Sequence, residues 1–205
     1  MSAPVKRRRE VTVERLLDAA LTTFAELGFQ AASVEDICRR GGFTRGAFYS
    51  SFRTKDELFL TLFRRETSQL MATLETRLAG FETETDPIAA VVRRCVATFR
   101  EDRAWTLVYI EYTLHASREP TAAAALRAHL DAVIGRLAAL VDDVTRRLGI
   151  TLALPADQLA RVIVGLHDGL ALQDLPRGGD PGATTLQYPA LELMLRAMAH
   201  PQEDT

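Results

Sequence analysis

Apolar residues recur at intervals of three and four positions through almost the whole chain, and this spacing constrains the fold more than any other feature. It is clearest in the first segment, at Leu16, Leu17, Ala20, Leu21, Phe24 and Leu27. Residues spaced in this way share one face of an α-helix, so each such segment predicts a helix with one buried side. We see no β-type alternation of apolar and polar residues and no internal repeat. The sequence therefore predicts an all-α protein.

Capping residues and helix breakers divide the periodic segments into separate helices. Ser33 and Thr44 are hydroxyl caps before two short helices, and Thr54 begins a capping box, Thr-Lys-Asp-Glu, before a long one. Gly28 and the Gly41-Gly42 pair mark helix ends. We expect helices from residue 11 to 27, after Ser33, after Thr44, and over about 54–79, 86–101, 104–117, 120–148, 155–175 and 186–199.

Composition and charge narrow the class of protein. The chain has 205 residues, of which 47% are hydrophobic and 25% charged, as is usual for a globular protein with a core. No apolar run approaches the roughly 20 residues of a membrane helix. The first residues, MSAPVKRRRE, lack the apolar segment of a secretory signal, and the two cysteines form no CxxC pair. We expect a cytoplasmic protein with reduced thiols and no membrane partner.

Four basic residues, Lys6, Arg7, Arg8 and Arg9, form a cluster near the N-terminus. Such a cluster is typical both of an arm that binds nucleic acid and of a solvated tail, and both interpretations stay open. In either case we expect residues 1–10 to form a flexible basic arm.

The segment from Ser33 to Tyr49 has the features of a helix-turn-helix, in which a short turn containing glycine joins two helices. Cys38 is small enough for a close helix crossing, and Gly42 can adopt the left-handed backbone of the turn. Phe43, Phe48 and Phe52 are predicted to face inward. The opposite face of the second helix is polar and positive, and it consists of Thr44, Arg45, Gly46, Tyr49 and Ser50. A face of this kind suits the major groove of DNA.

At this point the sequence "SVEDICRRGGFTRGAFYSSFRTKDEL" resembles the DNA-binding signature of the TetR family of transcriptional regulators. The resemblance covers residues 11–60 and includes the Gly-Gly-Phe turn, Thr-Arg-Gly, Tyr-x-x-Phe and Lys-x-x-Leu. Cys38 stands where the family usually has alanine, and Ser51 where it often has histidine. The resemblance implies an all-α protein with a three-helix DNA-binding domain over residues 11–57. A helical domain for ligand binding and dimerisation is implied over 58–205.

The resemblance also implies roles for single residues at the DNA. Ser33, Tyr49, Ser51 and Lys55 are expected to face phosphates. Thr44, Arg45, Gly46 and Ser50 are expected to read bases. Arg45 is the candidate for a bidentate contact to guanine, and a phosphate contact is its alternative role.

Dimerisation and ligand binding are implied for the later helices. The last two helices are expected to pair with a second chain through Gly165, Leu166, Gly169, Leu172, Leu191 and Leu195. The same leucines are equally compatible with the core of a single chain. A pocket for a small apolar or aromatic effector is expected to involve Phe99, Trp105, Tyr109, Tyr112, His129 and His167. The implied function is a dimeric repressor that binds a palindromic operator and is released by the effector.

Other functions have less support in the sequence. The four histidines form no HExxH motif, and neither GxSxG nor a P-loop is present, so we predict no enzyme, catalytic residue, metal site or cofactor. A regulator that activates, or that needs no ligand, stays compatible with the sequence. So does a thiol sensor at Cys38, beside the recognition helix.

Overall fold

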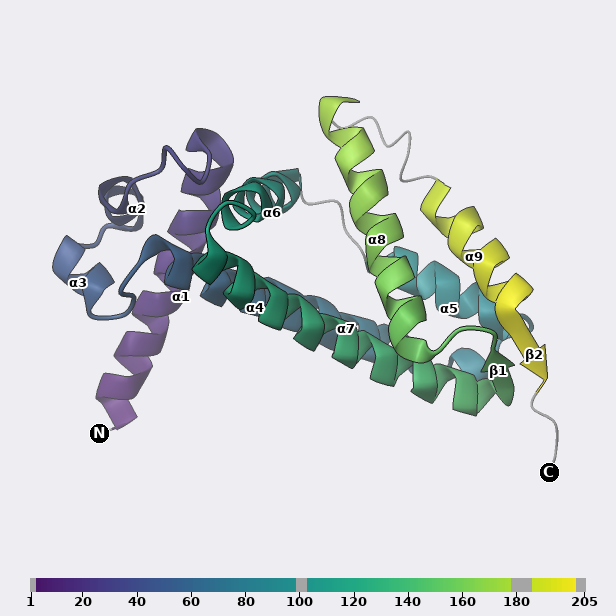
Figure 1. Cartoon of the computed structure of the whole chain (residues 1–205). Helices are drawn as coiled ribbons and strands as arrows, with labels where there is room; N and C mark the ends of the chain where they lie inside the picture. The colour runs from purple at the N-terminus through teal and green to yellow at the C-terminus, as the bar shows by residue number, and fades with distance from the viewer. Residues whose placement is uncertain (1–2, 99–102, 178–185, 202–205) are drawn as a thin grey trace. The chain divides into compact units, whose positions relative to one another are not determined.

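The computed structural model describes residues 3–98, 103–177 and 186–201, and most of these residues are helical (Figure 1). The helices are α1 (Ala3–Leu27), α2 (Val34–Gly41), α3 (Arg45–Tyr49), α4 (Lys55–Arg77), α5 (Pro87–Val96), α6 (Arg103–Ala116), α7 (Pro120–Leu148), α8 (Ala156–Asp174) and α9 (Gln187–Met198). The expected all-α class is confirmed. Most helix ends lie within two or three residues of the expected positions.

Two short strands are the exception to the all-α architecture. Strands β1 (Ile150–Leu152) and β2 (Ala199–Pro201) pair in antiparallel fashion, with Thr151 opposite His200. Three residues are too few to show the alternation that reveals a strand in a sequence. Single turns of 3₁₀-helix, η1 (Phe81–Thr83) and η2 (Leu175–Arg177), complete the described elements.

The first helix differs most from its expected length. We expected residues 1–10 to be a flexible arm, but α1 begins at Ala3 and runs without a break to Leu27. Pro4 falls in the first turn, where its missing N–H removes no helical hydrogen bond. The lysine, arginines and glutamate that follow are good helix formers, and no glycine interrupts them. The basic cluster is therefore part of a helix.

The chain divides into two compact units, which differ from the two predicted domains. The first unit joins Met1–Glu66 to Asp102–His129, and the second joins Thr67–Glu101 to Leu130–Thr205. The single boundary predicted at residue 57/58 does not separate these units. The difference has a physical cause, because aromatic side chains of α4 pack on α6 and draw it into the first unit.

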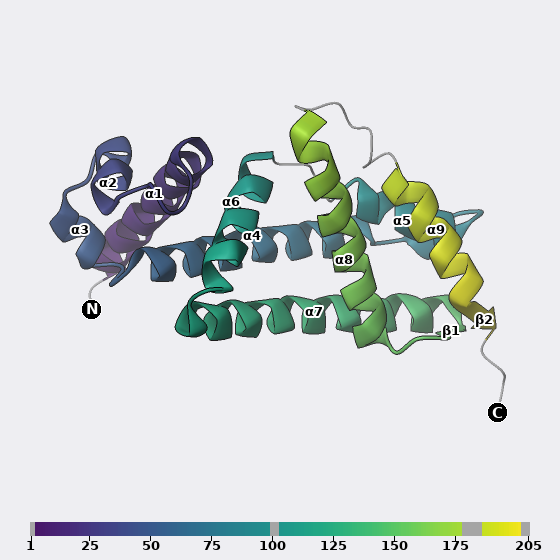
Figure 2. The same ribbon diagram turned by 45° about the horizontal axis from the view of Figure 1, so that its top comes forward.

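Helices α2 and α3 lie beside α1 in the first unit (Figures 1 and 2). The predicted hydroxyl cap of α2 is present and forms a capping box, because Ser33 accepts from the Asp36 N–H and Asp36 accepts from the Ser33 N–H. The Thr44 side chain likewise accepts from the Ala47 N–H and caps α3. Gly42 turns the chain between them with φ of 71°, in the left-handed region that favours glycine.

Phe29, in the turn between α1 and α2, is held by side chains of two other helices, α4 and α6. Its N–H donates to Glu111 of α6 at 2.5 Å, and its carbonyl accepts from Lys55 of α4 at 2.5 Å. Its ring is fully buried and meets Tyr112 edge-on, with the centroids 4.9 Å apart. Tyr112 in turn stacks on Phe59 of α4 at 3.7 Å. These contacts join the turn to α4 and α6.

The core of the second unit is built mainly from aliphatic side chains of α4, α5, α7 and α8, together with Phe81 of η1. Leu74, Phe81, Ala90 and Ala160 have no exposed surface, and half-buried leucines and valines of α7 and α8 pack around this cluster. In Figure 2, α8 and α9 lie next to one another, with β1 and β2 at the end of α9.

The Lys55 ammonium should contribute to stability. It donates to the carbonyls of Phe29, Gln30 and Ala32 at 2.5, 3.2 and 2.8 Å, so its three protons are used. Replacing Lys55 with Met leaves these carbonyls without the charged donor, and we expect the free energy of unfolding to fall by about 1–3 kcal/mol. Urea unfolding measures this change. Arg53→Met is the control, because the Arg53 side chain is 92% exposed. Equal changes in both variants would contradict this role.

Candidate nucleic-acid interface

The outer face of α3 presents a continuous exposed surface. Thr44, Arg45, Gly46, Tyr49 and Ser50 are all exposed, as the sequence predicts. On the opposite face Phe48 is 0% and Phe52 4% exposed, and both belong to the core. Phe43 is half-buried beneath the Arg15 guanidinium, 4.9 Å from its ring centre. A capped helix N-terminus thus points outward with short polar side chains around it.

Arg45 is the cation at the centre of this surface. Its Nη1 lies 2.5 Å from Glu35 Oε1 of α2, and its guanidinium carbon lies 5.8 Å from the centre of the Tyr49 ring. A hydrogen bond to Tyr49 and the nearby Glu35 carboxylate raise the pKa of Arg45. The side chain is 60% exposed, so it can exchange Glu35 for a base edge or a phosphate.

The smaller residues of α3 leave room for close approach. A Cβ added to Gly46 would meet only Thr44 Oγ1, at 3.7 Å, so nothing within the chain requires glycine there. The Ser50 hydroxyl donates to the Ala47 carbonyl at 2.7 Å. Tyr49 packs its ring edge against Phe48 while 49% of the residue stays exposed. Tyr49 therefore anchors one edge of its ring while it contributes to the exposed face of α3.

Two residues expected to face phosphates have other partners in the structure. The Ser33 hydroxyl and N–H both donate to Asp36 Oδ2, at 2.5 and 3.1 Å. Hydrogen bonds from Ser33 lower the pKa of Asp36 to about 2, so a carboxylate stands where a phosphate was expected. Lys55 donates to three carbonyls instead. In this structure Ser33 caps α2 and Lys55 binds turn carbonyls, and the phosphate contacts of both residues stay predictions. Ser51 is half-buried after α3, and its phosphate contact stays a prediction.

Arginines flanking α3 were missed by the sequence reasoning. Arg39 at the end of α2 and Arg53 before α4 have side chains 75% and 92% exposed. Each has an acidic neighbour. Arg39 forms an ion pair with Asp36, and the Nε atom of Arg53 lies 3.7 Å from Glu57 Oε2. Arg40 pairs with Glu26 of α1 in the same way. The signal available in the sequence was their position directly beside the predicted helix-turn-helix.

Cys38 lies behind this surface and is 4% exposed. Its thiol donates to the Thr44 carbonyl at 3.6 Å. Burial raises the pKa of the thiol, which disfavours the reactive thiolate. The geometry therefore favours a packing role at the crossing of α2 and α3 over the thiol-sensor alternative.

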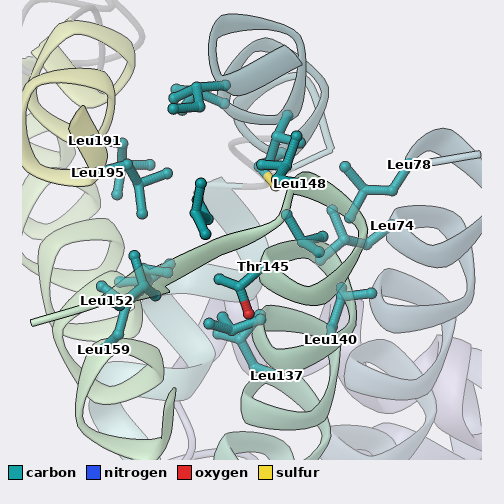
Figure 3. A pocket seen from close by; sticks show the side chains of 18 residues that line it. Leu74, Leu78, Leu137, Leu140, Thr145, Leu148, Leu152, Leu159, Leu191 and Leu195 are labelled. Atoms are coloured by element: carbon teal, nitrogen blue, oxygen red, sulfur yellow. The ribbon is translucent and has the colours of Figure 1, made fainter. Parts of the chain in front are cut away.

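The second unit encloses an apolar cavity of about 70 Å³ (Figure 3). Leu74 and Leu78 of α4, Leu140 and Leu148 of α7 and Leu191 of α9 point toward its centre in the figure. Most of its wall consists of leucine, isoleucine and valine, with Cys95 and Thr145 as the remaining members. This cavity is a candidate site for an apolar ligand.

The residues predicted to contact the effector lie elsewhere. Trp105, Tyr109 and Tyr112 belong to the aromatic cluster of the first unit, where Trp105 stacks on Phe59 at 6.2 Å and Tyr109 on Phe63 at 5.8 Å. Their spacing on α6 places them on one helix face. The helical period alone does not show whether such a face packs in a core or lines a ligand pocket.

The other predicted ligand residues are also away from the apolar cavity. His129 and Tyr112 line a wide groove of about 710 Å³ in the first unit, which also has the acidic members Asp56, Glu57 and Glu119. The Nδ1 atom of His167, on α8, lies 3.2 Å from the Nε2 atom of Gln187. Phe99 lies outside the described residues.

The predicted dimer residues divide between two faces. Gly165 is exposed and Leu172 is 52% exposed, and a Cβ on Gly165 or Gly169 would meet nothing within 4 Å. Leu166 is half-buried. Leu191 and Leu195 line the apolar cavity, and their place in a dimer interface stays a prediction. The side chains of α9 and α8 that do point outward were missed, and they are Leu186, Leu193 and Val162.

Metal-binding clusters and membrane-spanning helices are both absent from the described residues. Within the described ranges no group of three or more His, Cys, Asp or Glu is placed to hold a metal ion. No helix of the described part is long and apolar enough to cross a bilayer.

Two family models match the chain. "Bacterial regulatory proteins, tetR family" matches residues 16–62, and "BetI-type transcriptional repressor, C-terminal" matches residues 84–198. A transcriptional repressor of Mycobacterium tuberculosis is 39% identical over 66 residues, which are 32% of this chain and 33% of the relative. The fatty acid metabolism regulator of Bacillus subtilis is 23% identical over 94 residues, 46% of this chain and 48% of the relative. The match to these two thus spans half or less of each relative's length.

Solved structures share the fold over nearly the whole chain. GusR of Salmonella enterica gives a TM-score of 0.71 at 22% identity, covering 96% of this chain and 98% of GusR. FadR of Bacillus subtilis, solved with stearoyl-CoA, gives 0.70 at 18% identity, covering 90% and 98%. A protein of Saccharomonospora viridis solved with choline gives 0.67 at 19% identity, covering 93% and 99%.

Gly46→Ala should separate folding from DNA contact. Because the added Cβ would make only an ordinary contact with Thr44 Oγ1, we expect the free energy of unfolding to rise by up to about 1 kcal/mol. DNA affinity should nevertheless fall if the backbone approaches the duplex at Gly46. Urea unfolding and a gel shift on a duplex selected from a random library measure the two effects. Gly42→Ala is the control, because its left-handed backbone should cost about 1–2 kcal/mol. Unchanged DNA affinity in Gly46→Ala would contradict close approach.

Proposed function

Because the chain belongs to the TetR family of bacterial transcriptional regulators and is a DNA-binding regulator, we propose that it is a dimeric repressor released by a small apolar effector. The exposed outer face of α3 is the observation that carries this proposal. It offers Thr44, Arg45 and Gly46 at a capped helix start, in a turn-linked pair of helices of the kind that enters a major groove.

We assign recognition of the DNA base sequence to Arg45, which pairs with Glu35 in the structure without DNA. An arginine can donate two hydrogen bonds to guanine O6 and N7. The exposed arginines around α3 sit where phosphates would flank the groove, and they supply contacts without base preference. We assign the DNA-binding role to Thr44, Arg45, Gly46, Tyr49 and Ser50.

Dimerisation is proposed to use the outward face of α8 and α9. Val162, Gly165, Gly169 and Leu172 follow one another at intervals of three and four on α8, so they form a single stripe. Glycine lowers helix stability, and the open space around both glycines gives the single chain no reason to keep them. A second copy packed closely against the stripe supplies that reason. Leu186 and Leu193 of α9, 57% and 73% exposed, add apolar area.

Effector binding is proposed in the apolar cavity of the second unit. An unfilled apolar cavity of about 70 Å³ lowers stability by about 2 kcal/mol, which a bound apolar ligand would restore. The fold neighbours solved with stearoyl-CoA and with choline support a role for small ligands in proteins of this shape. An effector releases DNA only if it binds the DNA-free conformation more tightly. We place the protein in the cytoplasm, where its DNA lies.

Arg45→Ala tests the reading of sequence. We expect binding to the selected duplex to weaken by about 5- to 150-fold, corresponding to 1–3 kcal/mol of base discrimination. Binding to a scrambled duplex should weaken much less. Arg53→Ala is the matched control, since loss of a phosphate contact should weaken both duplexes alike. If Arg45→Ala also weakens both alike, Arg45 contacts phosphate and does not read bases.

Gly169→Trp tests the dimer. The open space around Gly169 should let the monomer fold, while the large ring blocks the close approach of a second copy. We expect the mass measured by sedimentation to fall from dimer to monomer at micromolar concentration. Gly135→Trp on α7, which also meets nothing within 4 Å, should stay dimeric. A Gly169→Trp variant that dimerises like the wild type rules out the stripe as the interface.

A further inference from the structure

The wall of the apolar cavity in the second unit is aliphatic throughout. Sixteen of its 18 residues are leucine, isoleucine or valine, contributed by α4, α5, α7, β1, α8 and α9. The remaining two, Cys95 and Thr145, are small and neutral. The wall contains no aromatic ring and no charged side chain. Figure 3 shows the labelled leucines converging from several elements on one space.

The two polar side chains offer a ligand no hydrogen bond of consequence. The Thr145 hydroxyl donates to the Asp142 carbonyl at 3.1 Å within α7, so its proton is committed. Burial raises the pKa of the Cys95 thiol to about 12, which keeps it neutral. A thiol is in any case only a weak hydrogen-bond donor. Apart from the Thr145 oxygen, which can still accept, the side chains of the wall offer a polar group no good partner, and burial of an unsatisfied polar group is strongly unfavourable.

These properties exclude several classes of ligand from the cavity itself. A quaternary ammonium needs an aromatic face or a carboxylate, and the wall has neither. A carboxylate or phosphate would need a cation or several N–H donors. A rigid ring also fits poorly, because it cannot bend to follow a space of about 70 Å³, whereas an alkyl chain can.

We propose that this cavity takes the alkyl chain of an aliphatic effector, with the polar group of that molecule outside the wall. The inference rests on the proposed function, which it deepens by naming the ligand class. It replaces the broader expectation of an apolar or aromatic effector. The slender shape of an alkyl chain suits a small cavity that is lined by methyl and methylene groups alone. The alkyl chain can belong to a free acid, an alcohol or an acyl thioester.

Binding to the full-length protein tests the class of ligand directly. The probes are decan-1-ol, decanoic acid and decanoyl-CoA, with choline and naphthalene as competing classes. We expect the decyl compounds that bind to raise the unfolding temperature by about 5 °C at saturating concentration, and the other two to have no effect. In calorimetry, affinity should rise by about fourfold for each methylene along a series of alcohols until the cavity is full. The decyl compound that binds most tightly shows whether the natural ligand is an alcohol, a free acid or an acyl thioester.

Variants place the ligand in the cavity. Val144→Phe adds a ring to the cavity wall from α7, and Leu195→Phe does so from α9. Each should weaken decyl binding at least tenfold. Ala139→Phe adds a ring on the exposed side of α7 and should leave binding unchanged. If one filled variant does not fold, the other carries the test, and both are checked by circular dichroism.

Several results would overturn the inference. These are no binding of any decyl compound, equal decyl binding in the wild type and both filled variants, and choline or naphthalene binding that the filled variants abolish. A gel shift separates this outcome from the proposed function. If decyl compounds bind but leave DNA bound, the ligand class stands and the effector role fails. If another class of compound releases DNA from the wild type, the effector role stands and the ligand class fails.

Discussion

The arrangement of the first unit depends on how Phe29 is held. Its N–H and its carbonyl are engaged by charged side chains from two other helices, Glu111 and Lys55, and its buried ring packs against Tyr112. The turn between α1 and α2 would otherwise carry exposed backbone groups and an apolar ring. By fixing this turn, α4 and α6 fix where α2 starts, and the cap at Ser33 and the glycine turn at Gly42 then place α3.

The helix-turn-helix was predictable because its signals are local. Each cap acts within three residues, so Ser33 and Thr44 were visible as helix starts before any packing was known. Gly42 was predictable because a left-handed backbone strongly favours one residue type. The exposed face of α3 followed from the helical period. The roles of Ser33 and Lys55 were not predictable, because a capping or carbonyl-binding donor looks the same in sequence as one that waits for phosphate.

The sites in the later helices depend on contacts between distant segments, which a period of 3.6 residues does not specify. Leu191 and Leu195 share a helix face, but the sequence does not say whether that face meets a second chain or a cavity. The aromatic residues of α6 have the character of a ligand pocket, and they serve as core because Phe59 and Phe63 lie opposite them. Conversely, the leucines that line the cavity cannot be distinguished in the sequence from ordinary core residues.

The arginines near α3 each carry a carboxylate partner, with Arg39 on Asp36, Arg40 on Glu26, Arg45 on Glu35 and Arg53 near Glu57. A duplex that takes one of these cations must first displace the attached acid, which stays close to the phosphates. Fewer condensed counterions are then released per arginine than on an unpaired basic surface. We therefore expect attraction to arbitrary DNA to be weaker than on an unpaired basic surface, so that residence on a genome depends more on a fitting base sequence.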